Sequence, residues 1–199
     1  KYTKALEKKE NYTDCLAVCK DALSEFPHDF WLRWRKAICL MHSDQTDDSI
    51  SIFEELLLEK NDWFLLRGAA EAYYNTEDFD KAFEYAIKAC IEASKSPSIG
   101  MTADAFLTAG EILHKLKNYD IAKKHVELTY LIRIEEGWNK IPQKLERAAK
   151  KVDIVLNEVD GESSKHLNEL KKYWKEKQNE FIKNLPVQMG KIKTILPNG

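Results

Sequence analysis

Residues 66–89 read LRGAAEAYYNTEDFDKAFEYAIKA, two amphipathic segments separated by a short polar turn. Small or apolar residues recur every three or four positions in both halves, a spacing typical of α-helix. Ala70 and Tyr73 mark the first half, and Phe79 opens a ladder of alanines in the second. The stretch therefore predicts two helices joined by a tight turn.

The same ladder recurs along the chain with a period close to 34 residues. Successive copies start 34, 33 and 40 residues apart, and their members lie three, seven and ten residues after each start. A repeat of this length with helical spacing predicts a stack of helix pairs, each burying its apolar face against its neighbours. The ladders are Tyr12–Cys15–Cys19–Ala22, the weaker Thr46–Ser49–Phe53–Leu56, Phe79–Ala82–Ala86–Ala89 and Tyr119–Ala122–Val126–Thr129.

Two further columns of residues align in the same register. A small residue stands nine positions before each ladder, and a larger apolar residue stands six positions before it. Small residues allow two helices to cross closely, so the first column predicts the crossing points of the pairs. The small-residue column is Thr3, Ala37, Ala70 and Gly110, and the larger apolar column is Leu6, Leu40, Tyr73 and Leu113. Matching turns between the two helices of a pair fall at Glu10-Asn11, Glu77-Asp78 and Lys117-Asn118.

In these features the chain resembles the tetratricopeptide repeat family. The third copy, Leu66-x-x-Ala69-Ala70-x-x-Tyr73 with Asp78-Phe79-x-x-Ala82 and Ala89, carries most of the resemblance, and Phe106-x-x-Ala109-Gly110 with Asn118-Tyr119-x-x-Ala122 supports it. The resemblance covers about residues 1–136 and implies an all-α fold of antiparallel helix pairs stacked as a right-handed superhelix. The second copy departs from the pattern at Lys36 and Thr46, which leaves its register open by about one residue.

The helix pattern divides the chain into three expected parts. Residues 1–136 form the repeats, 137–186 a capping helix pair, and 187–199 the start of a truncated β domain or a tail. We expect one or both capping helices to cover the apolar face of the last repeat. Repeat helices are expected at 11–26, 30–42, 47–59, 63–75, 78–95, 102–116 and 119–135, after a helix ending within 1–10. The capping helices are expected from Pro142 to Val159 and from Ser163 or Ser164 onward, the second with a stripe of Leu167, Leu170, Trp174, Phe181 and Leu185.

The last residues change character. Residues 188–199 alternate polar and apolar side chains and end in a turn signal, which predicts a β-strand. Gly190-x-Ile192-Lys193 resembles the opening strand of a cold-shock-type nucleic-acid-binding domain, although that family's aromatic motifs are missing. The resemblance implies that the chain continues beyond Gly199, and it supplies an alternative function in which the repeats accompany an RNA- or DNA-binding domain.

Composition restricts the classes of protein further. Residues 1–137 hold 18 Lys and Arg against 25 Asp and Glu, whereas residues 138–199 hold 13 against 8. A basic end after an acidic body hints at an anionic partner, but a solvated lysine-rich face explains it as well. No run of about 18 apolar residues is present, so no membrane span is expected. The thiols Cys15, Cys19, Cys39 and Cys90 in a helical repeat favour a reducing, cytoplasmic setting, and burial explains Cys15 and Cys19 better than metal binding.

The sequence predicts a binding protein rather than an enzyme. It contains no phosphate-binding glycine loop, no Gly-x-Ser-x-Gly and no His-Glu-x-x-His, and no cofactor or metal is expected. The first helix of each pair lines the concave face in such arrays, and aromatic side chains with arginine dominate binding energy at interfaces. Trp31 and Trp34 fit equally well as core residues between pairs. The predicted groove for a protein or peptide partner comprises Trp34, Arg35, Arg67, Glu71, Tyr74 and Glu111.

Overall fold

The computed structural model of the chain describes residues 2–43 and 45–184, and every regular element in these ranges is helical. The repeat helices lie within about two residues of the predicted ranges. Two short 3₁₀ turns, at Gly100–Thr102 and Leu156–Glu158, interrupt the loops. The helices are α1 (Tyr2–Lys8), α2 (Tyr12–Glu25), α3 (Phe30–Met41), α4 (Thr46–Glu59), α5 (Trp63–Asn75), α6 (Phe79–Ala93), α7 (Ala103–Lys115), α8 (Tyr119–Glu135), α9 (Gln143–Lys151) and α10 (Ser163–Asn184).

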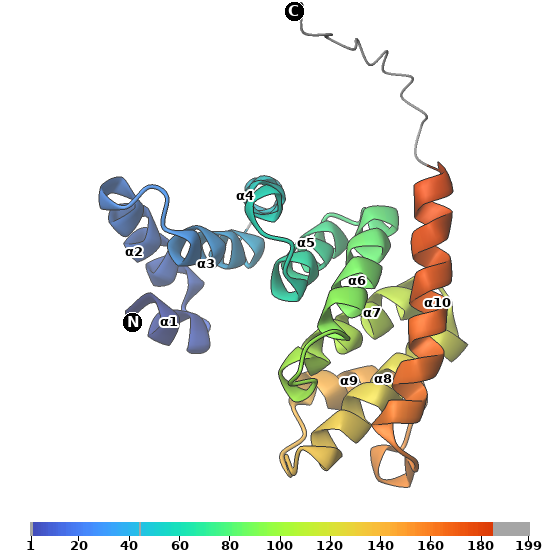
Figure 1. Cartoon of the computed structure of the whole chain (residues 1–199). Helices are drawn as coiled ribbons and strands as arrows, with labels where there is room; N and C mark the ends of the chain where they lie inside the picture. Colours follow the sequence, from blue (N-terminus) through green and yellow to red (C-terminus); the bar gives the residue numbers. More distant parts are fainter. Residues whose placement is uncertain (1, 44, 185–199) are drawn as a thin grey trace, which may run out of the picture.

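Consecutive helices pack against each other and build a curved stack (Figure 1). The first helices of the pairs, α1, α3, α5 and α7, lie toward the inner side of the arch. The second helices α2 and α4 lie farther out than α1, α3 and α5. The predicted all-α, right-handed superhelix of helix pairs is therefore confirmed. The division into domains stays a prediction.

The ladders form the contacts between helices. Ala82, Ala86 and Ala89 of α6 are fully buried, as are Ala122 and Val126 of α8. Such continuous burial along one face of each second helix is what a stack of pairs requires.

The weak second ladder lies in the same register as the others. Ser49, Phe53 and Leu56 are fully buried on α4. The Ser49 hydroxyl donates a 2.8 Å hydrogen bond to the Ala37 carbonyl, so the polar group at this position is satisfied inside the core. The alignment of the second copy is thus correct despite its atypical residues.

The small-residue column lies where first and second helices cross. A Cβ atom added to Gly110 would lie 3.1 Å from the Cβ of His125 and 3.3 Å from the carbonyl oxygen of Ala122. Ala37 and Ala70 are fully buried at the equivalent crossings. The close approach of α7 and α8 therefore requires a very small side chain at position 110.

The predicted turns share one backbone geometry. Glu10, Glu77 and Lys117 adopt positive φ angles of 57°, 63° and 61°. In each turn the next residue donates a hydrogen bond back to the helix, as from Asp78 N–H to the Tyr73 carbonyl at 3.0 Å. This is the Schellman arrangement, which satisfies carbonyl groups at the end of the first helix. The turns thus place each second helix antiparallel to its partner.

The first capping helix is half as long as the sequence suggests. A helix was expected from 142 to 159, but α9 ends at Lys151. Asp153 takes a positive φ of 55°, and Ile154 N–H donates to the Ala149 carbonyl at 2.9 Å. Ile154 then packs into the same apolar cluster as Ala149. The apolar residues after 152 have the spacing of a helix, but they pack back onto this cluster after the chain reverses direction at Asp153.

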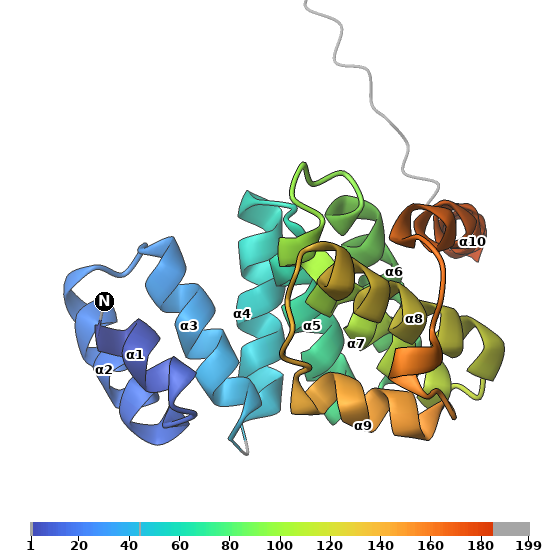
Figure 2. The same ribbon diagram turned by 90° about the horizontal axis from the view of Figure 1, so that it is seen from below.

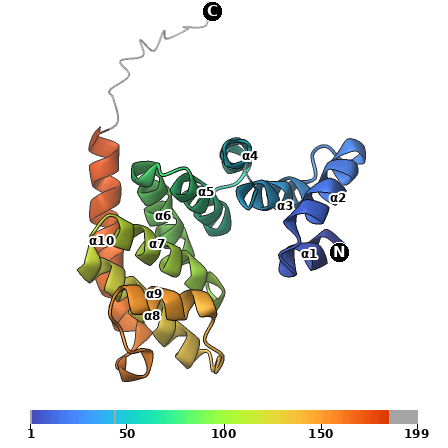
Figure 3. The ribbon, with the colours of Figure 1, turned by 180° about the vertical axis from the view of Figure 1, so that it is seen from behind.

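The two C-terminal helices contact different parts of the stack. Short α9 packs against α7 and α8, where the first helix of a further repeat would lie, whereas α10 packs against the second helices α6 and α8 (Figures 2 and 3). Helix α10 begins at Ser163, as predicted, and spans 22 residues. Leu167, Leu170, Trp174 and Phe181 of its predicted stripe pack in the main core, and Leu185 lies outside the described residues. The apolar face of the last repeat is therefore covered by α9.

A buried histidine and tryptophan attach α10 to the repeats. Trp174 Nε1 donates to His125 Nε2 at 2.9 Å, and His125 Nδ1 lies 2.8 Å from the Ile121 carbonyl oxygen. This pairing requires the proton on Nδ1. The indole also stacks on Phe106 with ring centres 5.4 Å apart. Burial lowers the pKa of His125 to about 4, so the ring is neutral at neutral pH.

The cysteines are core residues, as predicted. Cys15, Cys19 and Cys39 are fully buried in one small cluster between the first two repeats, and Cys90 is buried in the main core. Burial raises the pKa of the Cys15 and Cys90 thiols. Within residues 2–43 and 45–184, no three candidate ligands are arranged to hold a metal ion. None of the described helices is both long and apolar enough to cross a bilayer.

The register makes a first prediction at Gly110. Replacing it by Leu inserts a large side chain between α7 and α8, and such overpacking lowers the free energy of unfolding by about 1–3 kcal/mol. Thermal unfolding followed by circular dichroism should show a clear drop in Tm for Gly110→Leu. Ala17→Leu, which adds bulk on the exposed side of α2, is the matched control and should change Tm little. Equal Tm values for both variants would mean that the register is wrong.

The buried histidine makes a second prediction about pH. Its pKa is lowered from 6.5 to about 4, so between these values the unfolded chain binds more protons than the folded chain. Folding stability should therefore fall by roughly 2 kcal/mol from pH 7 to pH 5 through this group. Urea unfolding across this range measures the slope, and His125→Gln should flatten it. An unchanged slope in that variant would assign the pH dependence to other groups.

Candidate functional site

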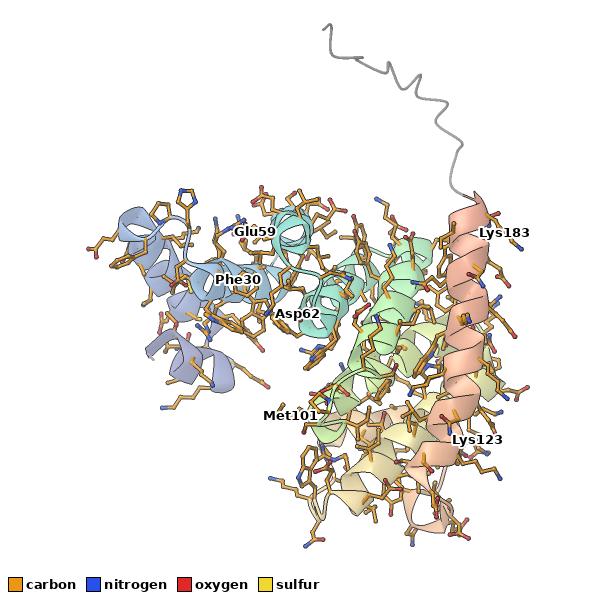
Figure 4. The ribbon with its side chains drawn as sticks, viewed as in Figure 1. Phe30, Glu59, Asp62, Met101, Lys123 and Lys183 are labelled. Atoms are coloured by element: carbon orange, nitrogen blue, oxygen red, sulfur yellow. The ribbon has the colours of Figure 1, made fainter. Side chains whose placement is uncertain are left out.

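An aromatic cluster lies at the N-terminal ends of α3 and α5, the first helices of two successive repeats. Trp31 stacks on Phe64 with ring centres 5.7 Å apart, and Trp34 meets both rings edge-on at 5.9 and 5.8 Å. Phe30 and Trp63 add further edge contacts. Figure 4 shows Phe30 at the start of α3, close to Asp62 just before α5. We refer to Phe30, Trp31, Trp34, Trp63 and Phe64 as the aromatic cluster.

The cluster is only partly buried. Trp31 remains 53% exposed, so it is a surface side chain rather than a core residue, whereas Trp34 is half-buried. The Arg35 guanidinium lies 5.7 Å from the centre of the Trp34 ring and donates a 3.1 Å hydrogen bond to the Thr3 hydroxyl. Exposed aromatic rings next to a guanidinium are typical of protein-binding surfaces.

A cavity of about 340 Å³ lies at the other end of the first helices. Residues from the C-terminal parts of α3 and α5 form one side, and α7 and α9 form the others. We refer to it as the charged cavity, because two carboxylates and two lysines line it. Its lining comprises Met41, His42, Glu71, Tyr74, Asn75, Thr108, Glu111, Ile112, Lys144 and Lys151.

One lysine of α9 bridges two repeats inside the charged cavity. Lys144 Nζ lies 3.0 Å from Glu71 Oε1 and 3.2 Å from Glu111 Oε2. Glu71 and Glu111 each follow the small crossing residue of their repeat, Ala70 or Gly110, so they occupy equivalent positions in the array. The ammonium thus forms ion pairs with two carboxylates that the repeat geometry brings together.

The surroundings determine the charge state of these groups. Burial favours the neutral form of Glu71, but Arg67, Lys144 and a 3.0 Å hydrogen bond from the Thr108 hydroxyl lower its pKa to about 2. Burial works against the charged form of Lys144 as well, yet the two carboxylates raise the pKa of the amine. Glu71 and Lys144 are therefore both ionised at neutral pH.

The predicted groove residues fall into two groups. Glu71, Tyr74 and Glu111 line the charged cavity, whereas Trp34 and Arg35 lie at the aromatic cluster. Arg67 contacts Asp104 of α7, with 3.6 Å between Nη1 and Oδ2. The structure thus does not place all six around one cavity, and their role in binding stays a prediction.

Sequence reasoning missed Lys144. The lysine-rich segment after residue 137 fits either an anionic partner or a solvated face, but this lysine reaches back to Glu71 of α5. The available signal was the equivalence of Glu71 and Glu111, because two carboxylates one repeat apart on a shared face favour a nearby cation. The expected cold-shock-type strand at 187–199 lies outside the described residues and stays a prediction, as does nucleic-acid binding.

The ion-pair network makes a testable prediction. In Lys144→Met the Glu71 carboxyl remains buried but loses a cation, so its pKa should rise by about one unit or more. A ¹³C NMR titration of glutamate carboxyl carbons measures this shift. Lys150→Met, on an exposed position of the same helix, should leave the titration of Glu71 unchanged. A Glu71 pKa that stays near 2 without Lys144 would contradict the proposed network.

Comparisons with known proteins support the fold. Two solved structures titled "Crystal structure of MamA" and "Crystal structure of MamA protein" match with TM-scores of 0.51 and 0.50 and sequence identities of 14% and 15%. The first alignment covers 92% of this chain and 98% of the other, and the second covers 94% of each. MamA has a tetratricopeptide-like helical repeat fold. A search of curated proteins by sequence finds no match.

A family model matches by sequence as well, over residues 30–174. The match runs from the start of α3 to Trp174 of α10, so it includes the aromatic cluster, the charged cavity and α9. Because it covers most of the chain, the protein belongs to the family described as "Domain of unknown function (DUF7017)".

Proposed function

We propose that the protein is a non-catalytic scaffold that binds a partner protein or peptide on the inner surface of its helical stack. The aromatic cluster supports this proposal most directly. Trp31 is 53% exposed yet is fixed by stacking on Phe64 and by edge contacts with Phe30 and Trp34. A rigid aromatic side chain loses little conformational entropy on binding and contributes a large apolar area.

The rest of the inner surface complements this anchor. Met101, 68% exposed, lies at the end of the loop between α6 and α7, on the inner side of the arch (Figure 4). Arg35 and Arg67 lie on successive first helices, with Arg67 paired to Asp104. An apolar anchor with a polar surround is the usual anatomy of a protein interface.

The charged cavity fits binding better than catalysis. A general acid or base works best with a pKa near the operating pH. The pKa of about 2 for Glu71 lies far below that range, and Lys144 is held charged by two carboxylates. We therefore assign no catalytic residue.

Substitution of Trp31 tests the proposal. Trp31→Ala should weaken capture of the partner by about tenfold or more, because a central aromatic anchor commonly accounts for that much binding energy. The partner is first trapped by a photo-crosslinking residue placed at Met101, and its affinity for the purified chain is then measured. Leu58→Ala, which removes a 90% exposed side chain from α4 on the outer side, is the matched control. Equal loss in both variants, or none in Trp31→Ala, would contradict binding on the inner surface.

A further inference from the structure

Residues 136–162 leave the helical stack and return to the point where they left it. The Glu135 carboxylate, at the end of α8, accepts hydrogen bonds from the Ser163 N–H at 2.7 Å and from the Ser163 hydroxyl. These bonds join the two ends of the excursion, independently of what lies between. We call residues 136–162 the α9 arm, because α9 is the α-helix that it carries.

Helix α9 is held by few contacts. Leu145, Ala148 and Ala149 are its buried apolar residues, and they pack on Leu107 and Val126. Two of the three are alanines, so α9 itself buries little apolar area, and the partly buried Ile141, Val152, Ile154 and Leu156 of the flanking chain complete this cluster. The ion pairs of Lys144 with the two glutamates add the polar part of the attachment. Irregular chain flanks α9 on both sides.

Helix α10 does not depend on α9 for its position. Its contacts are with α6, α7 and α8: Trp174 with His125 and Phe106, Phe181 with Phe83 at 5.5 Å between ring centres, and Lys124 with Glu169 at 2.9 Å. The contacts that position α10 therefore remain when α9 is lifted from its place.

We infer that the surface beneath α9 is a docking site for a basic amphipathic helix of a partner protein, and that α9 is its resident occupant. The site consists of Glu71 and Glu111 with the apolar Leu107 and Val126. This inference rests on the proposed scaffold function and specifies the chemistry of one partner segment.

The chemistry of α9 shows what the site accepts. Its nine residues, QKLERAAKK, contain four cations and one carboxylate, and they combine an ion-paired lysine with a small apolar stripe. The site offers the complement, two carboxylates from equivalent positions of consecutive repeats beside two apolar side chains. The adjoining cavity of about 340 Å³ leaves room for side chains larger than those of α9.

The experiment measures whether the site binds such a helix in trans once the arm is released. Lys144→Glu in the full chain places a carboxylate against Glu71 and Glu111 and should expel α9 by like-charge repulsion. The probe is a fluorescent peptide with the sequence of residues 141–154. Its affinity should be at least about tenfold higher for the Lys144→Glu chain than for the parent chain, where α9 competes as an intramolecular ligand. A probe carrying Glu in place of Lys144 should not bind.

Lys150→Glu is the matched control, since it makes the same charge change on an exposed position of α9. Limited trypsin digestion reports arm release, because both variants lose one cleavage site in the arm, and only Lys144→Glu should be cut faster there. A helical spectrum and a cooperative melt confirm that the stack remains folded. Adding Glu71→Gln and Glu111→Gln to the Lys144→Glu chain should abolish probe binding.

Three outcomes would overturn the inference. The first is an arm that stays resistant to trypsin in Lys144→Glu, and the second is an open arm without tighter probe binding. The third is a parent chain that dimerises through exchanged arms, which would make a second copy the occupant. None of these outcomes depends on Trp31, so they are separate from a failure of the scaffold proposal.

Discussion

The close crossing of the two helices within each pair is the constraint on which the rest of the structure depends. Each crossing has a small residue from the first helix against the ladder of the second, as Gly110 lies against Ala122 and His125. Because the pairs are built alike, neighbouring pairs stack with a constant offset and curve into an arch. Any side chain at an equivalent position then recurs on the same face, which is how the inner surface arises.

This recurrence explains both features of the inner surface. Trp34 and Arg67 each lie three residues before the crossing residue of their helix. Glu71 and Glu111 each directly follow the crossing residue. A repeat array therefore brings like charges together without any local sequence signal, and the pair of glutamates needs a further cation besides Arg67. Lys144 supplies that cation, so the electrostatics of the repeats also fix where α9 lies.

The sequence alone was sufficient to predict the helices that follow the repeat pattern. Burial of Ser49, Phe53 and Leu56 shows that even the weak copy could be placed, because its ladder spacing was intact. The length of α9 could not be predicted from spacing. Ile154 and Leu156 continue the helical spacing, but the chain reverses direction at Asp153 before they pack. The exposure of Trp31 was equally undecided, because an aromatic residue on a first helix fits both core and surface.

Two attachments divide the C-terminal region into parts of different stability. Helix α10 is held through buried aromatic and hydrogen-bonded contacts with the repeats, whereas α9 is held through one lysine and a small apolar stripe. Native-state hydrogen exchange tests this division most directly, since it reports the stability of each helix separately. Amides of α9 should exchange at least about tenfold faster than those of α8 and α10, although α9 lies between them in the chain. Equal protection of all three helices would contradict this division.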